Sequence, residues 1–356
     1  MISGDSFAKM TEEENKNTLG AIIFFTYIIA ALVLTCVLLN DLNLPSASST
    51  RPRRHASQST KRRQHGATNQ ESTRPWLFAA LSATSFAALS YHMLNFLLES
   101  YRVWSTTKLM DFKVRPRHIW TWSTESRLFR EFGEVICNDP RRFWWTRSAL
   151  VYSFGWNLYM SIEGTRLQVP HLGVYFLLNQ ILPVSFTQNL FLFRTSVLGR
   201  ADSDTDLTPT RLTVHPASAF RQGASTLSYL FVLALAPYSV GTRYFFPVLF
   251  ATRVLLFAGP YIILRPELGK DQLNPSTTTT TTTTTKYHTV KLYRWSCAIL
   301  AVSLGYMSMQ TIQTARSSTD GLAAIGNALH DSPAVSALGY DVMIGMVSLA
   351  CVFGGW

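Results

Sequence analysis

The chain has 356 residues, of which 47% are hydrophobic and only 15% are charged, against about 25% charged in an average soluble domain. This deficit of charge indicates a lipid environment rather than an aqueous one. The net charge of +11 does not indicate a nucleic-acid partner, because the lysines and arginines lie mainly between apolar runs rather than along one face.

A helix needs about 20 predominantly apolar residues to cross the hydrocarbon core of a bilayer. By this criterion the sequence contains about eight candidate spans, and it predicts an all-α fold, a polytopic transmembrane helical bundle. The predicted spans are 19–39, 76–98, 143–162, 172–193, 227–240, 244–264, 290–312 and 334–354. The protein is therefore expected to be integral to a membrane and to have membrane lipid as a partner.

The polar segments divide the chain into regions of different character. Residues 1–18 form a polar N-terminal tail before the first span, 19–39. Residues 40–75 are basic and too polar to bury a core, so they are predicted to be disordered. Residues 76–356 form the helical membrane domain, which contains a threonine-rich stretch at 274–286, also predicted to be disordered.

The segment between the second and third spans differs from the other connections. Its apolar residues recur near helical spacing among charged ones, which predicts an amphipathic helix lying on the membrane surface; they are Ile119, Trp122, Leu128, Phe129, Phe132 and Ile136. At its end, Asp139 followed by Pro140 predicts the start of a helix with the acid as its cap.

Two carboxylates, Glu163 and Asp341, lie in or at the end of predicted spans. An ionisable group inside a bilayer is costly, so each is a candidate functional residue. For Glu163 the alternative is an interfacial residue at a helix end. For Asp341 the alternative is a structural ion pair with Arg253 or Arg147.

The third predicted span carries an aromatic face. Trp145, Tyr152, Trp156, Tyr159 and Glu163 are spaced by seven, four, three and four residues, so they share one side of a helix. Such a face either packs against another helix or lines a pocket in which aromatic rings stabilise a cation while a carboxylic acid delivers a proton.

The fourth predicted span is unusually rich in amides and is interrupted by Pro183. Its polar side chains are four amides and one hydroxyl, Asn179, Gln180, Thr187, Gln188 and Asn189. They either form hydrogen bonds between helices or line a polar cavity opened where the proline breaks the helix. His92 and Asn95 on the second span raise the same question.

Familiar motifs for metal and phosphate chemistry are missing from the sequence. It contains no DDxxD, DxDD, P-loop or HExxH pattern, and its four cysteines show no CxxC or Cys/His spacing. Neither a metal nor another cofactor is therefore expected.

Several stretches resemble fungal membrane-bound terpene cyclases of the ascochlorin, ascofuranone and macrophorin type. The resemblance lies in ESRLFREF (125–132), DPRRFWWT (139–146), YMSIEG (159–164), QILPVSFTQNLF (180–191) and PAVSALGYD (333–341), about a third of the chain. It implies a metal-independent enzyme of fungal secondary metabolism, in the endoplasmic reticulum, that cyclises the prenyl chain of a meroterpenoid by protonating an epoxide or an alkene.

For such an enzyme the sequence assigns two groups of site residues. The proposed acid and its acid or base partner are Glu163 and Asp341. The expected pocket for the lipophilic prenylated substrate is formed by Tyr152, Trp156, Tyr159, Gln180, Gln188, Asn189 and Tyr340.

Two other classes of protein also fit the sequence. A transporter would place Arg253, Asp341 and the amides along a pathway, although the sequence shows no internal repeat of the kind common in such folds. A non-catalytic membrane scaffold would use the same helices for packing alone.

Overall fold

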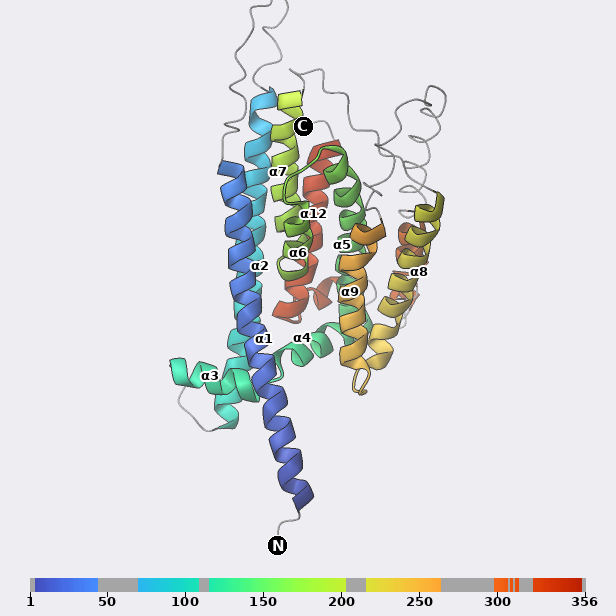
Figure 1. Cartoon of the computed structure of the whole chain (residues 1–356). Helices are drawn as coiled ribbons and strands as arrows, with labels where there is room; N and C mark the ends of the chain where they lie inside the picture. The colour runs from blue at the N-terminus through green and yellow to red at the C-terminus, as the bar shows by residue number, and fades with distance from the viewer. Residues whose placement is uncertain are drawn as a thin grey trace, which may run out of the picture.

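The computed structural model describes residues 4–43, 70–108, 115–202, 216–263, 298–306, 308–309, 311–313 and 323–353, and within these the chain is helical, without a strand. Most of the long helices run roughly alongside one another in a bundle (Figure 1). The helices are α1 (Gly4–Asn43), α2 (Gln70–Thr107), α3 (Pro116–Glu125), α4 (Leu128–Cys137), α5 (Pro140–Arg166), α6 (Leu172–Ile181), α7 (Val184–Asp202), α8 (Pro216–Ser239), α9 (Phe245–Ile263), α11 (Ala323–Ala328) and α12 (Pro333–Phe353).

Three helices in the described part are long and apolar enough to cross a membrane: Thr18–Asp41 of α1, Pro75–Thr107 of α2 and Pro333–Phe353, which is α12. The all-α prediction is confirmed, whereas the count of about eight spans is not. The other predicted spans are helical over most of their described residues. Two of them differ from a continuous apolar span: α5 carries charged residues at both ends, and the fourth segment is broken in two.

The outer surface of α1 fits a lipid environment. Leu19, Ile29 and Leu32 are 59%, 61% and 59% exposed, and apolar residues stay exposed on several sides of this helix. A soluble protein rarely exposes so continuous an apolar surface. In a bilayer the same surface faces hydrocarbon, and the helical backbone satisfies its own hydrogen bonds.

Two short helices, α3 and α4, lie across one end of the bundle rather than along it (Figure 1). They occupy the segment where the sequence predicts one amphipathic helix, and the chain interrupts the helix at Ser126 and Arg127. Trp122, Leu128 and Ile136 are buried on their inner side. The periodicity thus correctly located an amphipathic segment, which is divided into two helices.

The boundaries of the predicted polar regions also differ from the structure. The polar tail at 1–18 is helical from Gly4 onward, as the start of α1. Of the residues 40–75 that were predicted to be disordered, 40–43 continue α1 and 70–75 begin α2. The rest of that loop and the threonine-rich stretch at 274–286 lie outside the described residues.

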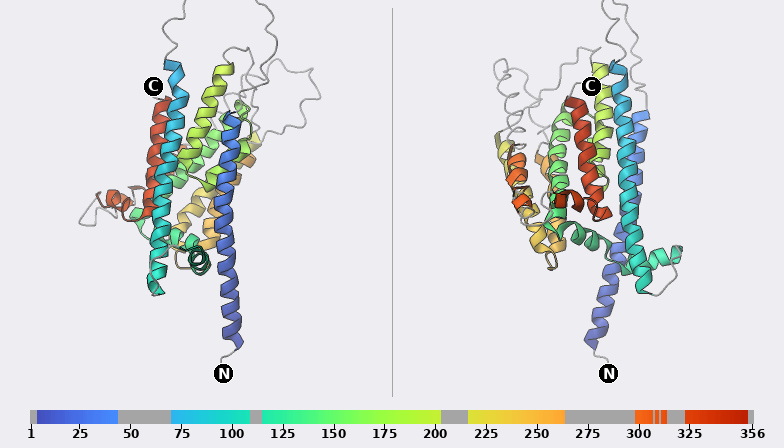
Figure 2. Two further views of the ribbon diagram at one scale, coloured as in Figure 1. Left: turned by 90° about the vertical axis from the view of Figure 1, so that its left-hand side faces the viewer. Right: turned by 180° about the vertical axis from the view of Figure 1, so that it is seen from behind.

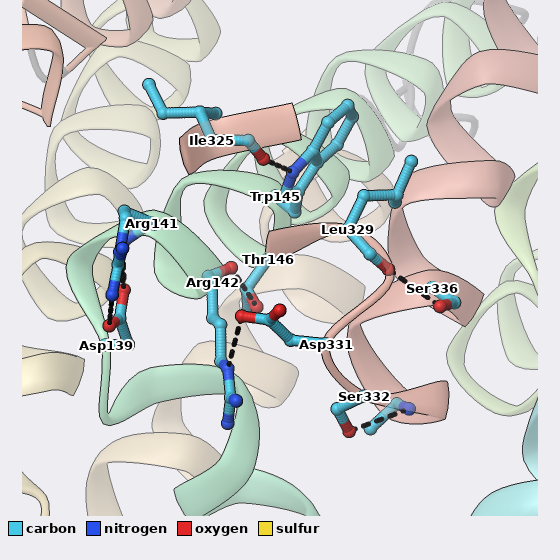
Figure 3. A network of polar contacts seen from close by, with 11 residues as sticks. Asp139, Arg141, Arg142, Trp145, Thr146, Ile325, Leu329, Asp331, Ser332 and Ser336 are labelled. Atoms are coloured by element: carbon cyan, nitrogen blue, oxygen red, sulfur yellow. Dashed lines mark hydrogen bonds and ion pairs between the residues drawn. The ribbon is translucent and has the colours of Figure 1, made fainter. Parts of the chain in front are cut away.

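The start of α5 is anchored as the sequence predicts. Asp139 has an extended backbone and its side chain accepts a hydrogen bond from the Arg141 backbone amide, which makes it the N-cap, with Pro140 in the first turn. Nearby, the Trp145 indole donates to the Ile325 carbonyl at 2.8 Å, and Arg142 pairs with Asp331 at 3.6 Å (Figure 3). These contacts join the start of α5 to the α11–α12 corner.

The bundle around α5 provides the frame for the candidate site. α5 packs against α9 and α12, and α2 packs against α7 and α12. The views in Figure 2 show α12, α7 and α2 close together on one side of the bundle, with α8 and α9 on the other. α1 packs against α3 and α6 at the edge.

Candidate functional site

The fourth predicted span is two helices, α6 and α7, separated by Leu182 and Pro183. Proline lacks an amide hydrogen and disfavours helical geometry in the residue before it. A break of this kind leaves the last carbonyls of α6 and the first amides of α7 without partners inside their own helices. In a membrane these groups need partners from neighbouring helices.

Asp341 of α12 supplies the partner for α7. Its Oδ2 accepts the Val184 amide at 2.9 Å, and its Oδ1 accepts both the Ser185 amide at 2.8 Å and the Ser185 hydroxyl. The side chain is buried, with 5% exposure. A carboxylate at a helix N-terminus satisfies free amides and complements the helix dipole. Asp341 is thus a cap supplied from another helix, and it pairs with neither Arg253 nor Arg147.

Tyr27 of α1 supplies the partner for α6. Its hydroxyl donates to the Gln180 and Ile181 carbonyls at 3.1 and 2.7 Å. The break at Pro183 is therefore satisfied by α1 on one side and by α12 on the other. The Gln180 side-chain amide, which the sequence places in the pocket, is buried with no hydrogen-bond partner.

A second polar contact links α5, α7 and α12. The Tyr152 hydroxyl donates to Gln188 Oε1 at 2.6 Å, and Gln188 Nε2 donates to the Gly345 carbonyl at 3.0 Å. Gly345 is needed for this close approach, since a Cβ there would lie 2.7 Å from the Tyr152 hydroxyl oxygen. Gln188 thus hydrogen-bonds between helices, whereas Asn189 donates to the Ser185 carbonyl of its own helix at 2.8 Å.

The aromatic face of α5 packs against three helices: Trp145 and Tyr152 face glycines of α12, whereas Trp156 and Tyr159 pack among residues of α6 and α7. Trp156 lies against Tyr159 and Phe191, with ring centroids 5.0 and 5.9 Å away. The side chain of Trp156 is buried, and its indole nitrogen has no hydrogen-bond partner. Of the two interpretations of this aromatic face, these contacts are those of a helix-packing surface rather than of a pocket wall.

Tyr340, the remaining predicted pocket residue, points toward α2. Its ring stacks on His92, with centroids 5.1 Å apart and an interplanar angle of 12°. The ring of His330 also contacts the Tyr340 ring, with centroids 6.2 Å apart. Tyr340 therefore belongs to a histidine–tyrosine stack beside Asp341 rather than to the Trp156 cluster.

Glu163 lies in the last turn of α5, where it forms an ion pair with Arg166. Gly339 faces Trp145 and Gly345 faces Tyr152, so α5 and α12 run side by side in the same direction. Asp341 is therefore level with about residue 147, and Glu163 lies about 24 Å further along the bundle at the helical rise of about 1.5 Å per residue. The structure does not bring the two predicted acids into one site.

A large cavity lies elsewhere, between α1, α4, α5, α8 and α9. Its volume is about 870 Å³, and we call it the lateral chamber. Its lining is mainly apolar and includes Gly20, Ile23, Leu128, Phe129, Phe132, Gly133, Phe143, Leu150, Leu233, Phe246, Leu249, Phe250 and Leu338, together with Thr146, Cys137, Thr252 and Arg253. Neither Glu163 nor Asp341 lines it.

The lateral chamber faces the side of the bundle. α1 and α9 both line it, yet they do not pack closely against each other. Burial raises the pKa of the Cys137 thiol in α4 to about 12, which keeps it protonated and unreactive. The chamber is thus suited to holding an apolar molecule rather than to thiolate chemistry.

A second cavity, of about 560 Å³, lies on the other side of α4 and is lined by four carboxylates. They are Glu99, Glu125, Glu131 and Asp331. The Trp104 indole donates to Glu125 at 2.8 Å, and this bond, together with Lys108, holds the Glu125 pKa below its ordinary value. Within the described residues, no group of three or more histidine, cysteine or acidic side chains could hold a metal.

Sequence reasoning missed the lateral chamber because its walls come from segments far apart in the chain. The one local signal was Arg253, a cation in the middle of an apolar segment. The contacts of Tyr27 and Asp341 with the break at Pro183 were also missed, although the break itself was expected.

Comparison of the chain with protein-family models, with curated proteins and with solved structures finds no match. The fold and the cavities define the class of the molecule: an all-helical protein with three helices suited to crossing a membrane in its described part and an apolar chamber at the side of its bundle.

Proposed function

We propose that this protein is a membrane-embedded terpene cyclase that acts on the prenyl chain of a meroterpenoid. The observation that carries the proposal is the lateral chamber. Its volume of about 870 Å³ lies within the range of ligand sites, about 300 to 1,000 Å³. Its apolar lining and its position at the side of the bundle suit a substrate that is itself dissolved in the membrane.

The lining of the chamber also suits the chemistry. Ring closure passes through a carbocation, which water would quench, so the reaction needs a dry enclosure. Phe129, Phe132 and Phe250 present aromatic rings to the chamber, and each ring face near a cation contributes about 0.5 to 2 kcal/mol. In this proposal these rings guide the folding of the prenyl chain.

Asp341 is our candidate for the acid that starts ring closure. It does not line the chamber itself, but it follows Leu338, which does, by about one turn of α12, so in this proposal the reacting end of the substrate passes Leu338 to reach it. Among the described residues, its Oδ2 accepts only the Val184 amide, which leaves a second lone pair on this oxygen to hold a proton. Glu163 lies about 24 Å away, so the proposal gives it no part in the same proton transfer.

The test uses the full-length protein in microsomes and a farnesylated phenol with either a terminal epoxide or a terminal alkene. Wild-type protein should convert at least one of them to a cyclised product, detected by mass spectrometry. In D₂O the alkene substrate should gain one carbon-bound deuterium. Absence of any cyclised product from either substrate would contradict the proposed activity.

The role of Asp341 is tested by Asp341→Asn, with Asp331→Asn as the matched control because Asp331 is exposed and pairs with Arg142. We expect Asp341→Asn to lower the rate by about 10²-fold or more and the control to retain activity. Because Asp341 also caps α7, Ser185→Ala, which removes one donor and leaves the carboxyl in place, reports the effect of a weakened cap alone. Normal turnover by folded Asp341→Asn would exclude Asp341 as the acid.

A transporter is the second candidate, and one observation favours it. A helix broken within the bundle, with a buried carboxylate at the break, is an arrangement that transporters use to bind ions or protons, and α6, α7 and Asp341 have this arrangement. Proton-coupled flux of a solute into vesicles that contain the purified protein, without conversion of a prenylated substrate, would favour transport over cyclisation.

A further inference from the structure

Arg253 is a cation in an apolar part of the bundle. It lies in α9, about 12 Å along the helix from its start at Phe245, and it is exposed to the lateral chamber that it helps to line. Within the described residues, it forms no ion pair with an acidic side chain. A charged side chain at this depth in a membrane costs several kcal/mol unless it is paired.

The position of Arg253 within the chamber can be read from its neighbours. Leu249, one turn earlier in α9, lies against Gly133 of α4, which forms one end of the chamber. Arg253 is therefore displaced by about 6 Å from that end. Its charge acts on Tyr27 of α1 and on Tyr229 of α8.

The other cations near the chamber are differently placed. Arg127 and Arg130 line the chamber outside the predicted spans, and Arg130 forms an ion pair with Glu134 at 2.7 Å. Arg147 is buried in α5, close to Ser308, and does not line the chamber. Arg253 is thus the chamber cation that lies within a predicted span and has no acidic partner in the described part of the chain.

We propose that the lateral chamber binds an amphiphile with an anionic group, which Arg253 holds, and an apolar chain, which the phenylalanines around α4 cover. The guanidinium fits a carboxylate or a phosphate because it offers several donors in one plane. The inference that this amphiphile is the substrate, a prenylated molecule with an acidic head, rests on the proposed cyclase function. The inference that the chamber binds such an amphiphile depends only on the chamber and Arg253.

The experiment measures binding to the full-length protein in phosphatidylcholine nanodiscs. The probe is a farnesylated aromatic carboxylic acid, and its methyl ester is the neutral comparison. Because a hydrogen bond to a charged group contributes about 1.5 to 3 kcal/mol, we expect the acid to bind about 10 to 100 times more tightly than the ester. Arg253→Gln should remove this difference, and Arg253→Lys should retain part of it.

Arg243→Gln is the matched control, because Arg243 lies in the exposed turn before α9 and contacts Tyr244. It should bind both compounds as the wild type does. Equal binding of acid and ester to the wild type would overturn the proposal. So would an Arg253→Gln variant that loses affinity for both compounds equally, since the arginine would then act only on the shape of the chamber.

Two further measurements identify the source of the anion. If phosphatidic acid displaces the probe, and native mass spectrometry finds an anionic phospholipid on the wild type that Arg253→Gln lacks, the amphiphile is a membrane lipid. If the phospholipid does not compete, the acid substrate is supported. Tight, Arg253-dependent binding of the acid without any cyclised product would leave this inference standing and remove the cyclase proposal.

Discussion

The interior of this bundle has two unlike regions. Between α5, α7 and α12 the helices are close, and the main polar groups are paired: Asp341 with the start of α7, and Tyr152 with Gln188. Between α1, α4 and α9 lies a cavity of about 870 Å³, and Arg253, which lines it, has no acidic partner in the described part of the chain. Polar residues in the first region hold the fold together, whereas the second region has room for another molecule.

We call the closely packed region between α5, α7 and α12 the closed region. The largest expected effect comes from replacing Asp341 in this region. Asp341→Asn replaces one acceptor oxygen by an NH2 group, which cannot accept a hydrogen bond from the amides of α7, so it should lower the free energy of unfolding by about 2 to 4 kcal/mol. The measurement is the unfolding of the purified protein in detergent. Asp331→Asn should change it by less than about 0.5 kcal/mol, and equal effects of the two variants would deny Asp341 its capping role.

A smaller loss should follow from forcing α5 and α12 apart. Gly345→Ala adds a Cβ that would lie 2.7 Å from the Tyr152 hydroxyl oxygen, and overpacking of this kind costs about 1 to 3 kcal/mol. Gly223→Ala in α8 is the control, because a Cβ there meets nothing within 4 Å. Thermal unfolding in detergent should separate the two variants, and a stabilised Gly345→Ala would show that the two helices can separate freely.

Removing one hydroxyl from the closed region should cost less again. Tyr152→Phe leaves Gln188 Oε1 without its donor at 2.6 Å, which should cost about 1 to 2 kcal/mol. The double variant Tyr152→Phe with Gln188→Leu should recover part of this loss, since no buried acceptor is then left unpaired. Strict additivity of the two substitutions would show that the side chains do not interact.

Outside the bundle core, the cap of α5 should contribute about 1 kcal/mol, measured as the stability lost in Asp139→Ala. The side-chain hydrogen bond with Arg141 is the main cause that holds the Asp139 pKa below its ordinary value. A carboxylate with a lowered pKa stabilises the fold above its unfolded pKa of 3.8, and this contribution is lost as the pH falls through the folded value. The Asp139→Ala deficit should therefore shrink in acid below about pH 4.

The region around the lateral chamber should tolerate added side-chain volume, which the closed region does not. Gly20 of α1 lines the chamber, and a Cβ there meets nothing within 4 Å. Gly20→Leu should change stability by less than about 0.5 kcal/mol, yet it fills part of the chamber and should weaken binding of a farnesylated probe. Unchanged binding would place the ligand elsewhere, and a large loss of stability would show that the chamber has no spare volume at this point.

Local features of the fold were predictable because they depend on neighbours in sequence. The apolar runs located the helices, Asp139 and Pro140 marked the start of α5, and Pro183 marked the break between α6 and α7. The count of about eight spans is not confirmed: three helices in the described part of the chain are long and apolar enough to cross a membrane. A run that is apolar on average can carry charges at its ends, as α5 does, or be broken, as between α6 and α7.

The partners of the site residues were not predictable in the same way. Asp341 was marked as a buried acid, but its partners Val184 and Ser185 lie far away in sequence, and no local pattern joins them. One signal was present: a helix that starts after Pro183 has no capping side chain of its own, so its cap must come from another element. The aromatic face of α5 was correctly located, while its packing partners in α6 and α7 needed the structure.

The break at Pro183 also affects how the chain folds during its synthesis. The amides at the start of α7 stay without their acceptor until Asp341, 157 residues later, has been synthesised. At about 5 to 20 residues per second, the nascent chain spends about 8 to 30 seconds with this junction open. During that interval water, lipid headgroups or the insertion machinery must shield it, so the bundle can close only when its last helix arrives.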